Sequence, residues 1–132
     1  MKVLTFGEMM LRLKPSESKR ILQSDKFEVT YGGSEANVAV SLSLQGDDVK
    51  YLTKVPDNLL GDSALGTLRK FGVDTDLVMK GGSRLGIYFF EKGASVRSTN
   101  VVYDRAGSSF ATASAQEFDW NSLLTDIGYF YF

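Results

Sequence analysis

Cysteine and histidine are both absent from the 132 residues of the chain. Without them the chain cannot form disulfide bonds, zinc sites built on Cys or His, thiol nucleophiles, or catalytic triads with a histidine base. Any chemistry carried out by these residues therefore uses carboxylates, hydroxyls, lysine, arginine or main-chain groups.

A strong charge of either sign is also absent, because 15 Lys and Arg residues are balanced by 16 Asp and Glu residues and the net charge is -1. This balance disfavours nucleic acid as a partner, since a basic surface is what attracts phosphates. No stretch approaches the roughly 18 apolar residues of a membrane span, and the N-terminus lacks the pattern of a secretory signal. The sequence predicts a cytoplasmic protein with neither a nucleic-acid nor a membrane partner.

The order of apolar segments and turn residues predicts an α/β fold. Strands and helices alternate in the first part of the chain, as they do in a parallel sheet covered by helices. The expected strands cover residues 3–6, 27–31, 49–55 and 73–79, and the expected helices cover residues 35–45 and 62–71. Ser34 is the candidate N-cap of the first helix, and Gly46 and Gly72 stand where the two helices end. The first helix is apolar around most of its circumference, so it is expected to be covered on most sides.

Beyond the glycine pair at 81–82 the pattern predicts an antiparallel hairpin, a short helix and a last strand. These elements cover residues 85–91 with 99–103, residues 120–124, and residues 127–132. A capping box from Ser114 to Glu117 and a second candidate cap, Asp119, precede the helix. A buried parallel strand needs neighbours on both edges, so the last strand predicts that the chain is the front part of a longer α/β protein. The alternative is a strand that docks at the edge of the sheet.

Two adjacent glycines, Gly32 and Gly33, stand where the second strand passes into the first helix. They permit a tight turn and let a ligand approach main-chain N–H groups without an intervening side chain. Asn37, one turn into the helix, offers both a donor and an acceptor, which suits a sugar diol. The alternative is an ordinary strand–helix turn with Asn37 facing solvent.

Further candidates for the same ligand come from two other parts of the chain. Glu8 follows the glycine that ends the first strand, at the carboxyl edge where open α/β sheets bind ligands. Tyr88, Tyr103 and Arg105 belong to the hairpin or follow it, and arginine is a bidentate partner for a ligand carboxylate. The alternatives are that Glu8 is a solvated loop acid, that the tyrosines only pack, and that Asp104 and Arg105 form a surface turn.

Several ordered blocks of the sequence are similar to one protein family. The blocks are residues 32–39, Gly46, residues 55–66 and residues 71–74. Together they resemble the amino-terminal half of the ribokinase-like (PfkB) carbohydrate kinases. Residues 84–97 and 101–109 look most like the 2-keto-3-deoxygluconate kinase branch of that family. Glu35 and Pro56 both depart from the broad family signature. Of the two, Glu35 fits this branch.

The resemblance implies a Rossmann-like αβα domain of the ribokinase-like fold, of which residues 1–132 are the N-terminal part. It also implies a small β-sheet lid with segments at about residues 10–31 and 84–105. The implied substrate is a small sugar acid or sugar, and the implied contacts are Glu8, Gly32, Gly33, Asn37, Tyr88, Tyr103 and Arg105. In this family-based interpretation Glu8 and Asn37 contact hydroxyls, Gly33 contributes main-chain groups, and Arg105 lies near the acid end of the substrate.

ATP and Mg²⁺ are the cofactors that the resemblance implies, with their main site outside these residues. In the family the catalytic aspartate belongs to a Gly-Ala-Gly-Asp motif in the later half, and this chain has no such motif. It also lacks Gly-x-Gly-x-x-Gly and the Gly-Lys of a Walker loop, which excludes the usual dinucleotide and phosphate-loop signatures. No catalytic, cofactor-binding or metal-binding residue is therefore assigned here. The chain is expected to be the sugar-binding portion of an ATP-dependent 2-keto-3-deoxygluconate kinase, and inactive in isolation.

Two alternatives stay open. The first is a fructokinase or another sugar kinase of the same family, because Asp104-Arg105 also suits the hydroxyls of a neutral sugar. The second is a non-catalytic binding or assembly module, in which the lid strands form homo-oligomers through their exposed edges.

Overall fold

A parallel three-stranded sheet forms the centre of the α/β part of the molecule. The computed structural model describes all residues from 1 to 132. In this sheet β1 (Lys2–Phe6) is the middle strand, and β4 (Asp48–Leu52) and β9 (Tyr129–Tyr131) run parallel to it on either side. Because successive side chains of a strand point to opposite faces, Val3 and Leu4 belong to different core clusters.

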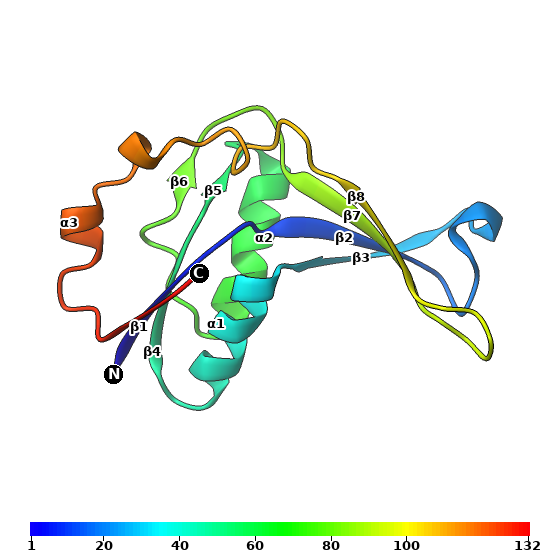
Figure 1. Ribbon diagram of the computed structural model, residues 1–132, viewed down its shortest axis with the longest axis horizontal. Helices are drawn as coiled ribbons and strands as arrows, with labels where there is room; N and C mark the ends of the chain where they lie inside the picture. The colour runs from blue at the N-terminus through cyan, green and yellow to red at the C-terminus, as the bar shows by residue number, and fades with distance from the viewer.

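Helices cover both faces of this sheet. On the Val3 side lie α1 (Ser34–Leu44) and α2 (Leu59–Lys70), and on the Leu4 side lie the 3₁₀ turn η2 (Ala115–Glu117) and α3 (Trp120–Leu123). Figure 1 shows the central strands between these two groups of helices. The arrangement confirms the expected α/β class with αβα layers. None of the helices combines the length and the apolar character needed to cross a bilayer.

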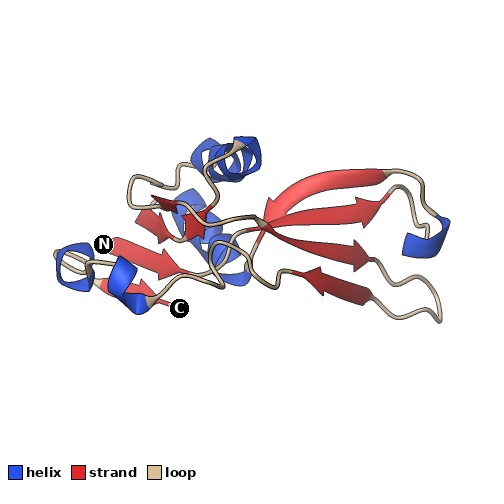
Figure 2. Ribbon diagram, turned by 90° about the horizontal axis from the view of Figure 1, so that it is seen from above, coloured by secondary structure: helices blue, strands red, loops and turns tan.

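A second sheet of four strands extends from the α/β part. It contains β2 (Met10–Pro15), β3 (Phe27–Gly32), β7 (Gly86–Glu91) and β8 (Asn100–Asp104), in the order β3-β2-β7-β8. Strands β2 and β7 are parallel, and the other two pairs are antiparallel. Figure 2 shows the four strands running away from the helices. The expected hairpin is therefore present as β7 and β8.

Three short elements complete the chain. β5 (Lys54–Val55) and β6 (Met79–Lys80) form a small parallel pair, and η1 (Ile21–Gln23) is a 3₁₀ turn between β2 and β3. Glu91 fastens η1 to the four-stranded sheet, because its carboxylate accepts hydrogen bonds from the Ile21 N–H at 2.6 Å and from Asn100 Nδ2 at 2.8 Å.

The expected strand 73–79 is wrong. Only Met79 lies in a strand, and Asp74 makes an isolated bridge with Lys50. The Asp74 carboxylate accepts the Asp76 N–H at 2.8 Å and pairs with Lys50 at 3.2 Å. A side chain that bonds to the main chain two residues on favours a turn over a strand.

Two other boundaries also differ from expectation. The strand expected at 49–55 is interrupted at Thr53 and forms β4 and β5. The helix expected at 62–71 begins at Leu59, because Asn58 is its N-cap and accepts the Gly61 N–H at 3.0 Å. Leu59 is 84% exposed, so the apolar periodicity begins one turn after the helix does.

The first helix differs in two respects. Ser34 is already helical and Gly33 is the N-cap, so the expected Ser34 cap is wrong. The expectation that the helix is covered on most sides is also wrong, since its only buried residues are Ala36 and Ala39 and Leu44 is 67% exposed. The C-terminal ends agree with the sequence, because Gly46 and Gly72 both adopt positive φ just beyond their helices.

Both expected caps are present, but only Asp119 caps α3, whereas the capping box of Ser114 and Glu117 belongs to the 3₁₀ turn η2. The Glu117 carboxylate accepts the Ser114 N–H at 2.6 Å, and the Asp119 carboxylate accepts the Ser122 N–H at 3.4 Å. Sequence patterning did not predict residues 10–15 as a strand; only the family resemblance placed them in a sheet. In the structure they form β2, a central strand of the four-stranded sheet.

Candidate functional site

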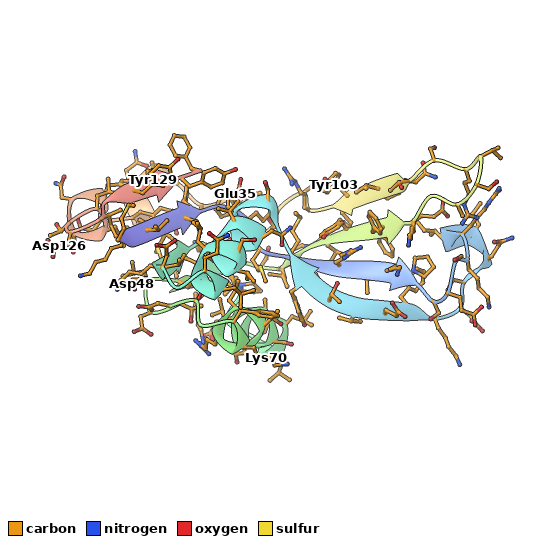
Figure 3. The ribbon with its side chains drawn as sticks, turned by 90° about the horizontal axis from the view of Figure 1, so that it is seen from below. Glu35, Asp48, Lys70, Tyr103, Asp126 and Tyr129 are labelled. Atoms are coloured by element: carbon orange, nitrogen blue, oxygen red, sulfur yellow. The ribbon has the colours of Figure 1, made fainter.

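The candidate site lies where the two sheets meet. The chain passes from β1 through Gly7 and Glu8 into β2, and from β3 through Gly33 into α1. Both connections therefore cross from one sheet or layer to the other at the same end of β1. Figure 3 shows Glu35 on α1 and Tyr103 on β8 on either side of this junction.

Glu8 is the carboxylate at the centre of this junction, and its side chain is only 10% exposed. Its Oε2 accepts a hydrogen bond from Ser108 Oγ at 2.8 Å. Its Oε1 lies 3.8 Å from Arg105 Nε, which is an ion pair without a direct hydrogen bond. Ser108 thus holds one oxygen of the Glu8 carboxylate, and the other oxygen, Oε1, stays available as an acceptor beside the Arg105 guanidinium.

Aromatic rings from the four-stranded sheet extend the site. The Arg105 guanidinium lies over the Tyr103 ring, 5.1 Å from its centroid, and this ring is 6.0 Å from that of Tyr88. Burial raises the pKa of the Tyr88 hydroxyl, Arg12 opposes that change, and Tyr103 adds to it. Tyr88 therefore carries a neutral phenol, which can donate and accept hydrogen bonds.

The paired glycines face these groups from the α/β part. A Cβ at Gly32 would lie 3.2 Å from the Tyr88 hydroxyl and 3.9 Å from Asn37 Oδ1. A Cβ at Gly33 would overlap with the main-chain oxygen of Glu8. Glycine is therefore required at position 33, where the opposing atom is main chain, whereas at position 32 the Tyr88 hydroxyl would have to move by only a few tenths of an ångström.

Two adjoining cavities open at this junction. The first has a volume of about 390 Å³ and is lined by Phe6, Gly7, Glu8, Met10, Ser34, Glu35, Tyr103, Arg105, Phe110 and Phe132. The second, of about 350 Å³, is lined by Met10, Arg12, Gly33, Ser34, Asn37, Tyr88, Phe90, Val101 and Tyr103. Met10, Ser34 and Tyr103 border both cavities, so the two are neighbours. Cavities of this size with a few convergent polar groups suit a small polar molecule.

Glu35 brings a second carboxylate to the first cavity. Its side chain lies directly over Gly7, where a Cβ would overlap with it. The buried Tyr51 hydroxyl donates to the Gly7 carbonyl at 3.0 Å. Burial raises the pKa of Tyr51 above its ordinary value, and the carboxylates of Glu35 and Glu8 raise it further.

The structure brings the seven residues proposed from sequence to this one junction. Glu8, Tyr103 and Arg105 line the first cavity; Gly33, Asn37, Tyr88 and Tyr103 line the second, and Gly32 lies against Tyr88. Their roles in binding stay predictions. Four polar residues of the site were not assigned to it, namely Arg12, Ser34, Glu35 and Ser108. Glu35 and Ser108 both stand in blocks that resemble the family, residues 32–39 and 101–109, but neither was proposed as a ligand contact.

The residues of this chain do not form a self-contained metal centre. No group of three or more His, Cys, Asp or Glu residues is placed to hold a metal ion.

A family model described as pfkB family carbohydrate kinase matches residues 1–132, the whole of the chain. The chain belongs to the pfkB family of carbohydrate kinases. A crystal structure of 2-dehydro-3-deoxygluconokinase from Thermotoga maritima is similar to it at 56% identity and a TM-score of 0.96, over 98% of this chain and 40% of that one. The expected ribokinase-like fold is thereby confirmed.

Two more relatives of this pfkB chain bear on substrate and nucleotide. A 2-dehydro-3-deoxygalactonokinase of Haloferax volcanii is 40% identical over 116 residues, which are 88% of this chain and 36% of the relative. A sugar kinase from Pyrococcus horikoshii, solved in complex with ATP, has 26% identity and a TM-score of 0.81, over 92% of this chain and 39% of that one. The chain thus spans between one third and two fifths of the length of these relatives.

Proposed function

We propose that residues 1–132 form the sugar-recognition part of an ATP-dependent kinase that phosphorylates 2-keto-3-deoxygluconate. The observation that carries the proposal is the position of Arg105, which lines the same cavity as Glu8 and Tyr103. A single guanidinium beside hydroxyl-binding groups suits a ligand with one carboxylate and several hydroxyls. Two of the relatives named above, those from Thermotoga maritima and Haloferax volcanii, are named as a 2-dehydro-3-deoxygluconokinase and a 2-dehydro-3-deoxygalactonokinase.

In this proposal each part of the site has its own task. Arg105 binds the sugar carboxylate, while Glu8 and Asn37 accept or donate hydrogen bonds to sugar hydroxyls. Main-chain groups at Gly33 and the rings of Tyr88 and Tyr103 enclose the sugar between the two sheets. The four-stranded sheet, with segments at about residues 10–31 and 84–105, acts as a lid. Positioning the acceptor hydroxyl is a large part of phosphoryl transfer.

The test uses a chimeric kinase in which residues 1–132 replace the matching segment of the Thermotoga maritima enzyme. Measured with ATP and Mg²⁺, this chimera is expected to phosphorylate 2-keto-3-deoxygluconate with a higher kcat/KM than fructose. A preference for fructose would support the alternative of a fructokinase. Activity on neither sugar would contradict the proposal.

A second candidate function rests on the exposed outer strand of the four-stranded sheet. Every residue of β8 is exposed, among them Val101, Val102 and Tyr103. An open strand edge of this kind pairs readily with another strand. Light scattering decides between the two: a concentrated solution of the chain that stays monomeric contradicts an assembly role.

A further inference from the structure

Ser108 occupies an unusual position among the residues around Glu8. It is 1% exposed, lies 100 positions from Glu8 in the sequence, and reaches it from the loop that follows β8. Its hydroxyl accepts the Ala111 N–H at 3.0 Å. Since the hydroxyl carries one proton of its own, that proton is directed to Glu8 Oε2, 2.8 Å away. The direction of this hydrogen bond is therefore fixed by the protein.

The loop that carries Ser108 is itself held in place. The Ser109 N–H donates to the Arg84 carbonyl at 2.8 Å, and Ser83 Oγ donates to the Gly107 carbonyl at 3.1 Å. The Thr112 N–H donates to the Ser108 carbonyl at 3.0 Å. Ser108 thus has little freedom to move with respect to the base of β7, and it acts on Glu8 as a fixed donor.

The space on the other side of Glu8 is also limited. A Cβ at Gly86 would lie 2.5 Å from Glu8 Oε2, so this oxygen is enclosed between Gly86 and Ser108. The other oxygen, Oε1, has no hydrogen-bond donor and lies 3.8 Å from Arg105 Nε. The two oxygens of one carboxylate therefore have different surroundings.

We propose that Ser108 is a positioning residue, which fixes the rotation of the Glu8 carboxylate so that Oε1 is the oxygen offered to a sugar hydroxyl. The inference rests on the proposed function, because it assigns Glu8 to the sugar. Without the Ser108 donor, Oε2 lacks its partner and the carboxylate can rotate away from the substrate. Ser108 then governs sugar affinity without contacting the sugar.

The experiment compares two adjacent buried serines in the chimeric kinase. Ser108→Ala is expected to raise the KM for the sugar about tenfold, the loss of one hydrogen bond to a charged group. The KM for ATP is expected to stay unchanged. Ser109→Ala is the matched control, because Ser109 is equally buried and its hydroxyl has no hydrogen-bond partner. Ser108→Thr keeps the hydroxyl and is expected to restore most of the affinity.

A double-mutant cycle tests whether Ser108 acts through Glu8. In a Glu8→Gln background, Ser108→Ala is expected to change the sugar KM by less than about twofold, since the group that it positions is already altered. The same cycle is measured by urea unfolding of the 132-residue chain, which needs no sugar. There the two substitutions are expected to be coupled by about tenfold in the unfolding equilibrium constant.

Each outcome decides a separate point. No coupling in unfolding overturns the inference, whatever the chimera does. The inference is also overturned if the two substitutions are coupled in unfolding but the Ser108→Ala and Ser109→Ala variants have the same KM for the sugar. In that case the proposed function still stands. A chimera that phosphorylates neither sugar overturns the proposed function and the positioning role that rests on it.

Discussion

Gly33 lies against the main-chain oxygen of Glu8 so closely that a Cβ has no room between them. This contact joins the start of α1 to the connection between β1 and β2, and residues of both segments line the cavities of the site. The opposing atom is main chain, so it cannot move aside as a flexible side chain would. Gly33 is therefore required by the fold itself, in addition to lining the candidate site.

Gly33→Ala is expected to destabilise the chain by about 1–3 kcal/mol, the usual cost of overpacking. Urea unfolding measures this change. Gly66→Ala is the matched control, because Gly66 lies within α2 with no atom near its missing Cβ. That substitution is expected to stabilise the helix by about 0.5–1 kcal/mol. Equal effects of the two substitutions would contradict the close contact at Gly33.

Arg105→Ala is expected to weaken binding of an acidic sugar by about 1.5–3 kcal/mol, because a charge-assisted hydrogen bond to the carboxylate is lost. Kinetics of the chimeric kinase measure the change as an increase in KM. Fructose, which has no carboxylate, serves as the control ligand and is expected to lose much less. An unchanged KM for the acidic sugar would place Arg105 in a surface turn only.

Tyr51→Phe removes the buried hydroxyl that donates to the Gly7 carbonyl and is expected to cost about 1 kcal/mol at neutral pH. The folded-state pKa of Tyr51 is raised, chiefly by burial. Its contribution to stability is therefore fully present below the ordinary tyrosine pKa of about 10 and decreases as the pH rises above it.

Unfolding measured between neutral and alkaline pH tests the Tyr51 prediction. The parent chain is expected to lose stability above about pH 10 more steeply than the Tyr51→Phe variant. The exposed Tyr129 provides the control substitution, Tyr129→Phe. Parallel pH profiles for the parent chain and Tyr51→Phe would show that Tyr51 is free to ionise in the folded protein.

Glu91→Gln is expected to make the chain less sensitive to acid. Hydrogen bonds from Asn100 and from the Ile21 N–H lower the pKa of Glu91 in the folded protein. The stabilisation that they give is present above the ordinary glutamate pKa and is lost as the pH falls below about 4. The NMR shift of the Ile21 amide, followed from neutral to acid pH, reports the change. Glu28→Gln, at an exposed position on β3, is the control.

The isolated 132-residue chain is expected to show no kinase activity with ATP and Mg²⁺. The reason is that it has neither the Gly-Ala-Gly-Asp motif nor a cluster able to hold a metal ion. The measurement is ADP production with and without 2-keto-3-deoxygluconate. Sugar-dependent ADP release by the pure chain would contradict this prediction, and the chimeric kinase is the positive control.

The spacing of apolar residues in the sequence predicted those helices and strands whose apolar residues are the ones buried in the structure. The apolar run that ends at Gly7 indicated β1, and the spacing of Ala64, Leu65 and Leu68 indicated α2, whose buried side it forms. The strand expected at 73–79 failed because Asp74 bonds to the main chain at Asp76, a contact that apolar patterning ignores. Where a polar side chain replaces the main-chain hydrogen bonds between strands, the pattern of apolar residues alone predicts a strand although a turn forms.

The residues of the candidate site likewise fall into those that local sequence signals could identify and those that they could not. Gly33 and Asn37 could be proposed from a strand–helix junction, and Arg105 from its place after the predicted hairpin as well as from a family resemblance. Ser108 could not, because its importance depends on a hydrogen bond to a residue 100 positions away. Glu35 was visible in the sequence, but its place over Gly7 depends on how α1 meets β1. Contacts between distant segments are determined by the packing of the folded chain, and they produce no recurring pattern of residue types in the sequence.

The pairing of β1 with β9 also has a consequence for synthesis on the ribosome. Val3 has Val49 as one neighbour and Tyr129 as the other, so β1 is flanked on both edges only after β9 has been translated. Pairing over such a sequence separation is slow to form. A nascent chain that has released β1 and β4 but not yet β9 therefore exposes one edge of β1, and an unpaired strand edge of this kind is prone to aggregate.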